Sequence, residues 1–292
     1  MKLSILALSL LAACSLAQAQ SNDTLKKVAD SGKMVVAYRE SSVPFSYLDG
    51  TKPIGFSEEL TTHVVKAVQD KIGKTITVEH QAVTSANRIP LLQNGTIDLE
   101  CGSTTNNSLR GKDVAFAINH FYTGTRLVVK KSSKIKNFAD LKGKTVASTT
   151  GTTNVVVLRK YNQDNKLDMN LVMGKDHSDS FLLVEQDRAV AFGMDDILLF
   201  GLVANAKNPA DYEVVGDSLQ VEPYACMLRK DDPAFKLLVD NTFKDLMTSG
   251  AFEKMYNKWF MSPIPPKGMN LNLPMAKELR DNLKAMSDKP AT

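Results

Sequence analysis

Charged and hydroxyl-bearing side chains follow four apolar runs of this sequence, at the points where the runs end. These side chains are Arg39, the segment from Ser103 to Arg110, the threonines between Thr149 and Thr153, and Asp195. Each run is typical of a β-strand, and in an open α/β sheet ligands bind beyond the carboxyl ends of the strands. We therefore expect these side chains to converge on one crevice. Arginines and hydroxyls outnumber the one conspicuous acid, which favours a small ligand with more negative than positive charge.

The elements that would position these residues alternate between strand and helix. Apolar residues at helical spacing predict a helix over 57–70. Strands are predicted at 34–39, 75–83, 97–101, 144–148, 170–174, 189–194, 212–215 and 224–229. The other helices are predicted at 85–92, 138–141, 152–161, 178–187, 196–203, 232–249, 251–260 and 275–287. This alternation indicates the α/β class with parallel strands.

The first 20 residues have the features of a secretory signal peptide. Lys2 precedes an apolar run that ends in Ala17-Gln18-Ala19, so we expect residues 1–19 to be removed after Ala19. The segment Leu11-Ala12-Ala13-Cys14 also resembles a bacterial lipobox, which makes a lipid anchor at Cys14 the alternative. No later stretch has 18 continuous apolar residues. We expect an exported, soluble mature protein.

Cys101 and Cys226 are the cysteines that remain after such cleavage. An even number of cysteines in an oxidising compartment favours a disulfide, and the alternative is two separate buried thiols. No CxxC or Cys/His cluster is present, so we expect no structural metal. The net charge of +4 is spread along the chain in short lysine pairs, so we expect no nucleic-acid partner.

Several motifs together resemble the bacterial periplasmic solute-binding proteins for polar amino acids, solute-binding protein family 3. The segments are VPFSYLDG with GFSEEL, IDLECGSTTNN, FADLKGKTVASTTGTT, RAVAFGMDD, YACMLRKDDP and FEKMYNKWF, and they span nearly the whole mature chain. Within the family, the glutamate/aspartate-binding subgroup is most similar. That similarity rests on RESSVPFSY, NRIPLLQNGT, ECGSTTNN, KDH and SPIPPK.

The resemblance implies a type II periplasmic binding protein, with two α/β lobes joined by two crossing strands and a ligand cleft between the lobes. It places lobe 1 at 24–122 and 221–262, lobe 2 at 123–220, and a C-terminal extension at 263–292. The crossings would lie near 121–125 and 218–222. In this fold Cys101 and Cys226 lie on neighbouring strands of lobe 1.

At one end of the cleft, the resemblance assigns Arg110 to the α-carboxylate of an amino acid, and an arginine fork suits that group. Thr153 would share the α-carboxylate, while Ser103 and Thr105 would contact the α-amino and α-carboxylate groups. Asp195 would pair with the ammonium group, with Asp196 as the alternative. By spacing alone Arg110 is a surface arginine, the Ser103 segment is a turn, and Thr153 is a helix cap.

The resemblance assigns four residues at the other end to a distal carboxylate: Arg39, Ser85, Arg88 and His177. Arg39 ends a buried strand, where an unpaired charge would be costly. Arg88 lies at a helix start, where a cation opposes the helix dipole. His177 alone would more simply be a packed, hydrogen-bonded side chain.

The charges of these residues favour a dicarboxylic amino acid. Three arginines and Asp195 match a ligand with two negative groups and one positive group. We therefore expect a periplasmic L-glutamate/L-aspartate-binding protein, monomeric and without a cofactor, that serves an inner-membrane ABC permease. The alternatives are a cyclohexadienyl dehydratase on the same fold and a ligand sensor for a chemoreceptor. Because Asp195 and Asp196 are the only cleft carboxylates that the sequence reveals, a catalytic acid is not expected.

Overall fold

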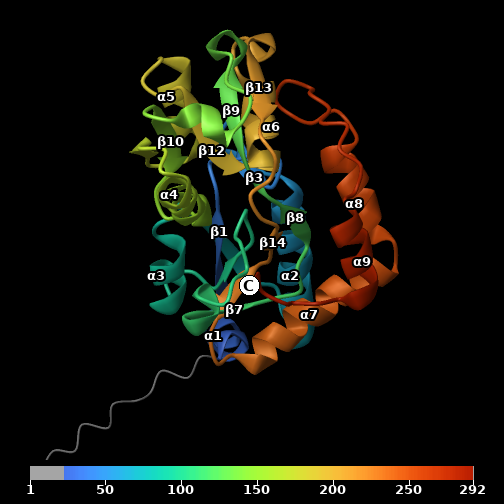
Figure 1. The fold of residues 1–292 in the computed structure, drawn as a ribbon. Helices are drawn as coiled ribbons and strands as arrows, with labels where there is room; N and C mark the ends of the chain where they lie inside the picture. Colours follow the sequence, from blue (N-terminus) through green and yellow to red (C-terminus); the bar gives the residue numbers. More distant parts are fainter. Residues whose placement is uncertain (1–22, 292) are drawn as a thin grey trace, which may run out of the picture.

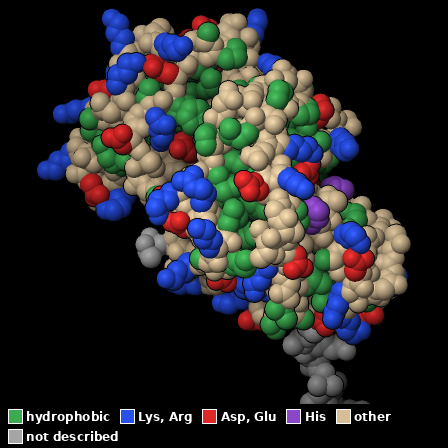
Figure 2. Space-filling model, turned by 90° about the vertical axis from the view of Figure 1, so that its right-hand side faces the viewer, with side chains coloured by type: hydrophobic (Ala, Val, Ile, Leu, Met, Phe, Trp, Pro, Cys, Tyr) green, Lys and Arg blue, Asp and Glu red, His purple; other side chains and the backbone are tan. Residues whose placement is uncertain are grey.

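A computed structural model describes residues 23–291, so the predicted signal peptide and Cys14 lie outside the described residues. The chain forms two five-stranded sheets, one in the lower and one in the upper half of Figure 1. We call the half built on the sheet that contains β1 lobe 1, and the half built on the sheet that contains β10 lobe 2. None of the described helices is long and apolar enough to cross a membrane. On the face drawn in Figure 2, basic side chains are scattered among acidic ones.

The sheet of lobe 1 has the strand order β5-β1-β6-β15-β7. In that order the strands are Thr77–Ala82, Lys33–Tyr38, Leu99–Glu100, Met227–Arg229 and Val114–Phe116. Strand β1 runs parallel to β5 and β6, whereas β15 is antiparallel to both of its neighbours. A late segment of the chain therefore returns to complete the sheet that the early strands begin.

The sheet of lobe 2 has the strand order β11-β10-β12-β9-β13. In that order the strands are Asn170–Gly174, Thr145–Thr149, Ala191–Asp195, Thr125–Lys130 and Tyr212–Val215. The chain passes between the sheets through β8 (Phe121–Thr123) and β14 (Glu222–Tyr224), which pair with each other in antiparallel fashion. Strand β12 ends at Asp195, which pairs with Thr125 directly beyond β8, and β10 runs parallel to β12, so the carboxyl ends of both strands lie on the side of the crossing strands.

Helices surround both sheets. Those of lobe 1 are α1 (Thr24–Ser31), α2 (Phe56–Ile72), α3 (Arg88–Gln93), α7 (Pro233–Thr248) and α8 (Ala251–Phe260). Those of lobe 2 are α4 (Thr153–Asn165), α5 (His177–Glu185) and α6 (Asp196–Asn205). Helix α9 (Lys277–Ala285) follows in the C-terminal extension. A small sheet of β2 (Ser41–Ser42), β3 (Ser46–Asp49) and β4 (Lys52–Ile54) and four short 3-10 helices, Arg110–Lys112, Lys131–Ser133, Phe138–Leu141 and Pro209–Asp211, complete the described elements.

Helix α2 shows why the sequence folds locally as it does. Leu60, Val64 and Val68 recur at helical spacing and are fully buried. Acidic residues lie in the first turn and Lys71 in the last, as the helix dipole favours, and Gly73 ends the helix in a left-handed conformation with φ 70°. The predicted helix over 57–70 is thus confirmed and is slightly longer.

The predicted strand over 224–229 is wrong as a single element. Its first residue ends β14, which pairs with β8, and its last three form β15 in the sheet of lobe 1. The strand breaks at Ala225 and Cys226 because its two ends pair with strands of different sheets. Local periodicity does not show with which strand a segment pairs. Strand β6 is likewise only Leu99–Glu100, and helix α3 begins after Ser85 rather than at it.

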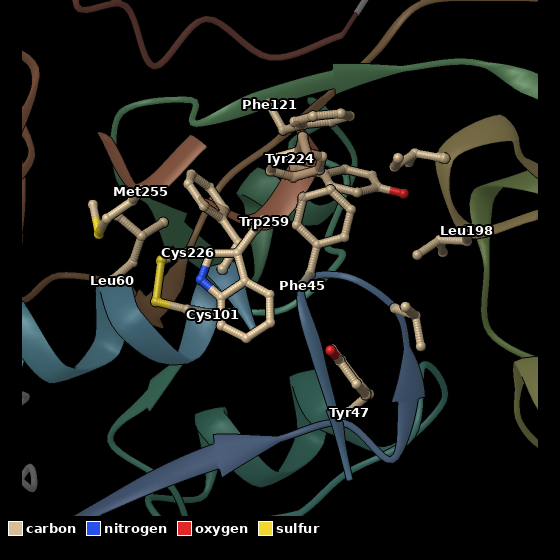
Figure 3. Close-up of a cluster of buried hydrophobic side chains, with 14 of the residues drawn as sticks. Phe45, Tyr47, Leu60, Cys101, Phe121, Leu198, Tyr224, Cys226, Met255 and Trp259 are labelled. Atoms are coloured by element: carbon tan, nitrogen blue, oxygen red, sulfur yellow. A yellow bond between two sulfur atoms is a disulfide. The ribbon is translucent and has the colours of Figure 1, made fainter. Parts of the chain in front are cut away.

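The predicted disulfide between Cys101 and Cys226 is confirmed. It lies in a large aromatic core in which Phe45 packs edge-on against Phe121 and Tyr224 (Figure 3). Both cysteines adjoin segments that lead to the crevice, since Ser103 follows one and Tyr224 precedes the other. The core therefore fixes the base on which the site is built.

Candidate functional site

Residues of both lobes meet in a buried cluster around Arg39, which directly follows β1. The Arg39 Nη2 group lies 2.6 Å from Asp176 Oδ1, 3.1 Å from Ser85 Oγ and 3.3 Å from His177 Nε2. The hydroxyl of Ser41 donates to the second oxygen of Asp176 at 2.7 Å. Arg39, Ser41 and Ser85 belong to lobe 1, whereas Asp176 and His177 begin α5 of lobe 2. The two lobes are therefore in contact, with the crevice closed.

Two arginines of this cluster keep unused hydrogen-bond donors although they are almost fully buried. Arg39 is 0% exposed, and its Nε and Nη1 groups have no partner among the described residues. Arg88 is 2% exposed and its Nε group also lacks a partner there. Buried donors without acceptors are costly, so these two guanidinium edges need an acceptor that the protein does not supply.

The other Arg88 contacts hold its guanidinium group in place. It donates to Ser103 O at 3.3 Å and to the hydroxyl of Thr104, and it lies 3.8 Å from Glu100 Oε1. Burial lowers the pKa of Arg88 to about 9, against the attraction of Glu100. The side chain thus stays protonated at neutral pH. Its position agrees with the prediction that Arg88 lies in the crevice.

His177 joins this cluster as a neutral side chain. Burial, and after it the charge of Arg39, lower the pKa of His177 to about 3. Because an arginine only donates, His177 Nε2 accepts from Arg39 and Nδ1–H donates to the Thr149 hydroxyl at 3.1 Å. Burial favours the neutral form of Asp176, but the charge of Arg39 and the hydrogen bond from Ser41 hold the pKa of this carboxyl below its usual range.

A second cluster forms around Arg110 at the other end of the crevice. Arg110 Nη1 donates to Thr105 O at 2.9 Å, and Nη2 donates to Gly151 O of lobe 2 at 3.2 Å. The hydroxyl of Thr153 donates to Glu222 Oε2 at 2.7 Å, and Thr105 donates to the same oxygen. Burial lowers the pKa of Arg110, opposed by the attraction of Glu222. A pocket of about 470 Å³ opens beside these residues.

Asp195 ends β12 and is 1% exposed. It accepts from Asn154 Nδ2 at 2.7 Å and from the hydroxyl of Tyr224. Burial, and secondarily the charge of Glu222, raise the pKa of Asp195 to about 8. Asp196, the alternative, instead accepts from the Thr123 hydroxyl at 2.7 Å and begins α6. A cation beside Asp195 would restore its charged form.

The structure brings all nine residues of the predicted ligand set to this crevice, in contact with one another or with shared neighbours: Arg39, Ser85, Arg88, Ser103, Thr105, Arg110, Thr153, His177 and Asp195. Ser85 accepts from Arg39 rather than capping a helix, and Ser103 donates to the Ser42 hydroxyl at 3.1 Å. Their contact with a ligand stays a prediction.

Sequence reasoning missed three buried carboxylates beside the arginines. Asp176 faces Arg39, Glu100 lies near Arg88, and Glu222 accepts from both threonines of the Arg110 cluster. The expectation that Asp195 and Asp196 are the only acids here is therefore wrong, and so is the count of charges built on it. The KDH motif contained Asp176, and its place before a helix was the available signal.

Comparisons with known proteins agree with this geometry. Residues 34–262 match the bacterial extracellular solute-binding proteins, family 3. The chain is 50% identical to the L-glutamate/L-aspartate-binding protein of Pseudomonas aeruginosa over 92% of this chain and 90% of that protein. It is also 50% identical to the glutamate/aspartate import solute-binding protein of Escherichia coli, over 98% and 96%. A crystal structure of a mutant ArgBP from T. maritima has a similar fold, with TM-score 0.72 and 25% identity over 80% of this chain and 98% of that one.

Proposed function

This chain belongs to the bacterial extracellular solute-binding proteins, family 3, and we propose that it binds L-glutamate or L-aspartate and delivers it to an ABC importer. In this proposal the chain is exported to the periplasm after cleavage at Ala19, and lobe 1 comprises 24–122 and 221–262. Lobe 2 comprises 123–220, and the protein acts as a monomer with an inner-membrane permease as its partner.

The unpaired guanidinium edges of Arg39 and Arg88 carry the proposal. Both arginines are buried, and each keeps at least one donor without an acceptor in the described chain. A carboxylate presents two acceptor oxygens in the plane that guanidinium groups recognise. The distal carboxylate of glutamate or aspartate would supply them, whereas the amide of glutamine would offer one acceptor and bring unwanted donors.

The remaining groups suit the α-amino and α-carboxylate end. Arg110 and the hydroxyl of Thr153 would hold the α-carboxylate, and Asp195 would take the ammonium group. Glu222 balances Arg110 in the same way that Asp176 balances Arg39. The two relatives at 50% identity are named as binding proteins, which favours binding without a covalent step over the dehydratase alternative.

Two arginine variants test the proposal by titration calorimetry with glutamate, aspartate and glutamine. The wild type should bind the acidic amino acids tightly and glutamine far more weakly. Arg110→Ala should weaken the binding of every amino acid, because all carry an α-carboxylate. Arg88→Ala should instead remove the preference for glutamate over glutamine. Losing one side of a buried charge pair costs about 2–5 kcal/mol, roughly 30-fold to several thousand-fold in affinity.

Arg159→Ala is the matched control, since Arg159 is exposed on α4 away from the crevice. It should bind like the wild type. Equal affinity of the wild type for glutamate and glutamine would contradict the proposed function. Unchanged glutamate binding by Arg88→Ala would remove the distal-carboxylate assignment on which the choice of ligand rests.

A further inference from the structure

The loop that carries Thr105 and Arg110 lies between two other segments of the chain. On one side Asn106 N donates to Pro223 O at 2.8 Å, and Ala225 N donates to Thr104 O at 3.0 Å. On the other side Ala291 N donates to Asn106 O at 2.9 Å, and Asn107 pairs with Ala291 in parallel fashion. The residues from Ser287 to Ala291, which we call the tail, therefore cover the edge of the loop opposite to the crossing strand β14.

Two buried asparagines fasten the tail to lobe 1. Asn106 and Asn119 are 2% and 1% exposed, and Asn106 Nδ2 donates to Asn119 Oδ1 at 3.0 Å and to Asp288 O at 2.8 Å. Asn119 Nδ2 donates to Lys289 O at 2.8 Å, and Asn119 N donates to Ser287 O at 3.0 Å. Both side-chain amides donate to backbone carbonyl groups of the tail, so the tail satisfies much of their hydrogen-bonding capacity.

The tail is itself held by helices of the same lobe. Ser287 N donates to the side chain of Asn282 at 3.0 Å, and Asn282 Nδ2 donates to Asn119 O at 2.7 Å. Lys236 of α7 pairs with Asp288 at 2.9 Å. The tail thus connects the loop to α7 and α9.

The loop transmits this support to the Arg110 cluster. Arg110 N donates to Asn107 Oδ1 at 2.9 Å, and the Arg110 guanidinium group is aimed by its bond to Thr105 O. Asn106 lies between Thr105 and Asn107, and its backbone forms hydrogen bonds with β14 on one side and with the tail on the other. Ala291 also lines the same pocket as Arg110, Thr153 and Glu222. The tail contacts the loop from Asn106 onward, beyond the Ser103 and Thr104 contacts of Arg88, so a shift of Asn106 and Asn107 would misdirect Arg110 rather than Arg88.

We propose that the tail is a positioning element of the binding site, which fixes the 105–110 loop so that Arg110 meets the α-carboxylate of the ligand. The inference rests on the proposed function and adds a role for the C-terminal extension. It assigns Asn106 and Asn119 as positioning residues, because they act through the loop and not by touching the ligand. Loss of the tail contacts should lower the affinities for glutamate and for glutamine by the same factor, since both carry an α-carboxylate.

Asn106→Ala tests the proposal, because it removes both side-chain bonds and keeps the backbone bonds to β14 and Ala291. The dissociation constant for glutamate should rise by about 3- to 30-fold, the effect of losing one or two net hydrogen bonds, and the ratio of glutamate to glutamine affinity should not change. Asn241→Ala is the matched control, since this asparagine is exposed on α7, outside the tail, and its side chain makes no hydrogen bond in the described chain. It should bind like the wild type.

Two further variants separate positioning from general stability. In an Arg110→Lys background, which lacks the fork that the loop aims, Asn106→Ala should cost far less than it does alone. Removal of residues 288–292 leaves both asparagines intact and should weaken both amino acids as Asn106→Ala does. Failure of the wild type to bind acidic amino acids would overturn the proposed function. If the wild type binds, an Asn106→Ala variant that matches Asn241→Ala, or that loses only its preference for glutamate, would overturn the role of the tail.

Discussion

Buried carboxylates and arginines face one another along the whole crevice. Asp176 pairs with Arg39, Glu100 lies near Arg88, and the third arginine is balanced by Glu222. Asp195 forms no ion pair among the described residues, and burial raises its pKa, in the opposite direction to that of Asp176. The site thus holds one acid that is ready to take a positive charge.

The raised pKa of Asp195, about 8, predicts a pH dependence of binding. In the closed, ligand-free protein this carboxyl holds a proton at pH 7, and a ligand ammonium would favour the carboxylate, so binding should release a proton. Affinity should therefore rise with pH up to about 8, by at most about tenfold per pH unit. Calorimetry in buffers of different ionisation enthalpy measures the proton count.

His177 is another group in the crevice whose pKa is strongly lowered, and a distal carboxylate could protonate it on binding. The His177→Gln variant cannot take up a proton at this position, so the same titrations on it measure proton release without a contribution from His177. No proton release by that variant between pH 6 and 7.5 would show that Asp195 does not carry the ammonium group.

Among the elements, the segments on either side of the disulfide matter most for the site. Cys101 lies between β6 and the loop with Ser103, and Cys226 lies between β14 and β15. The bond closes a chain segment of 125 residues that includes all of lobe 2. A cross-link over so long a segment stabilises mainly by restricting the unfolded chain.

Replacing both cysteines, in Cys101→Ala with Cys226→Ala, should lower the free energy of unfolding by about 2–5 kcal/mol. Glutamate affinity should change much less, because backbone pairing of β15 with β6 and β7 still holds the two segments. Denaturant titration measures the first effect and calorimetry the second. In the wild type without its signal peptide, a thiol assay after denaturation without reductant should find no free thiol, and two reactive thiols would contradict the expected stabilisation.

At the scale of the whole molecule, Gly151 of lobe 2 packs directly against the backbone of lobe 1. Its φ is +82°, and a β-carbon built there would lie 2.6 Å from the Cα atom of Ala86 in the other lobe. Neighbouring atoms of this contact belong to the backbone, which cannot swing aside as a long side chain can. Only glycine fits at this position of the closed crevice.

Gly151→Ala should therefore prevent full closure and raise the dissociation constant for glutamate by about tenfold or more, because the binding-competent population falls. Gly143→Ala is the matched control: its φ of +68° imposes similar backbone strain, yet a β-carbon there meets nothing within 4 Å. Both variants should lose comparable stability in a thermal melt. Similar glutamate affinities of the two variants would show that closure does not depend on this contact.

The sequence by itself determined the α/β class, the amphipathic helix α2, the residue types of the crevice and, through a motif resemblance, the family. These features depend on local periodicity and on residues close in the chain, as in the run that ends at Arg39. Spacing alone gave Arg110 only the features of a surface residue. The resemblance, rather than periodicity, placed it in the cleft.

Only the tertiary structure decided which partner each buried charge has. Asp176 is 137 residues from Arg39 in the chain, and Glu222 is 117 residues from Thr105. The tail, likewise, reaches Asn106 from 182 residues away. A buried charged group can pair with any suitable partner that folding brings near it. Its partner therefore depends on the fold of the whole chain. Local sequence patterns therefore predict that such residues need partners, but the packed lobes determine which partners they find.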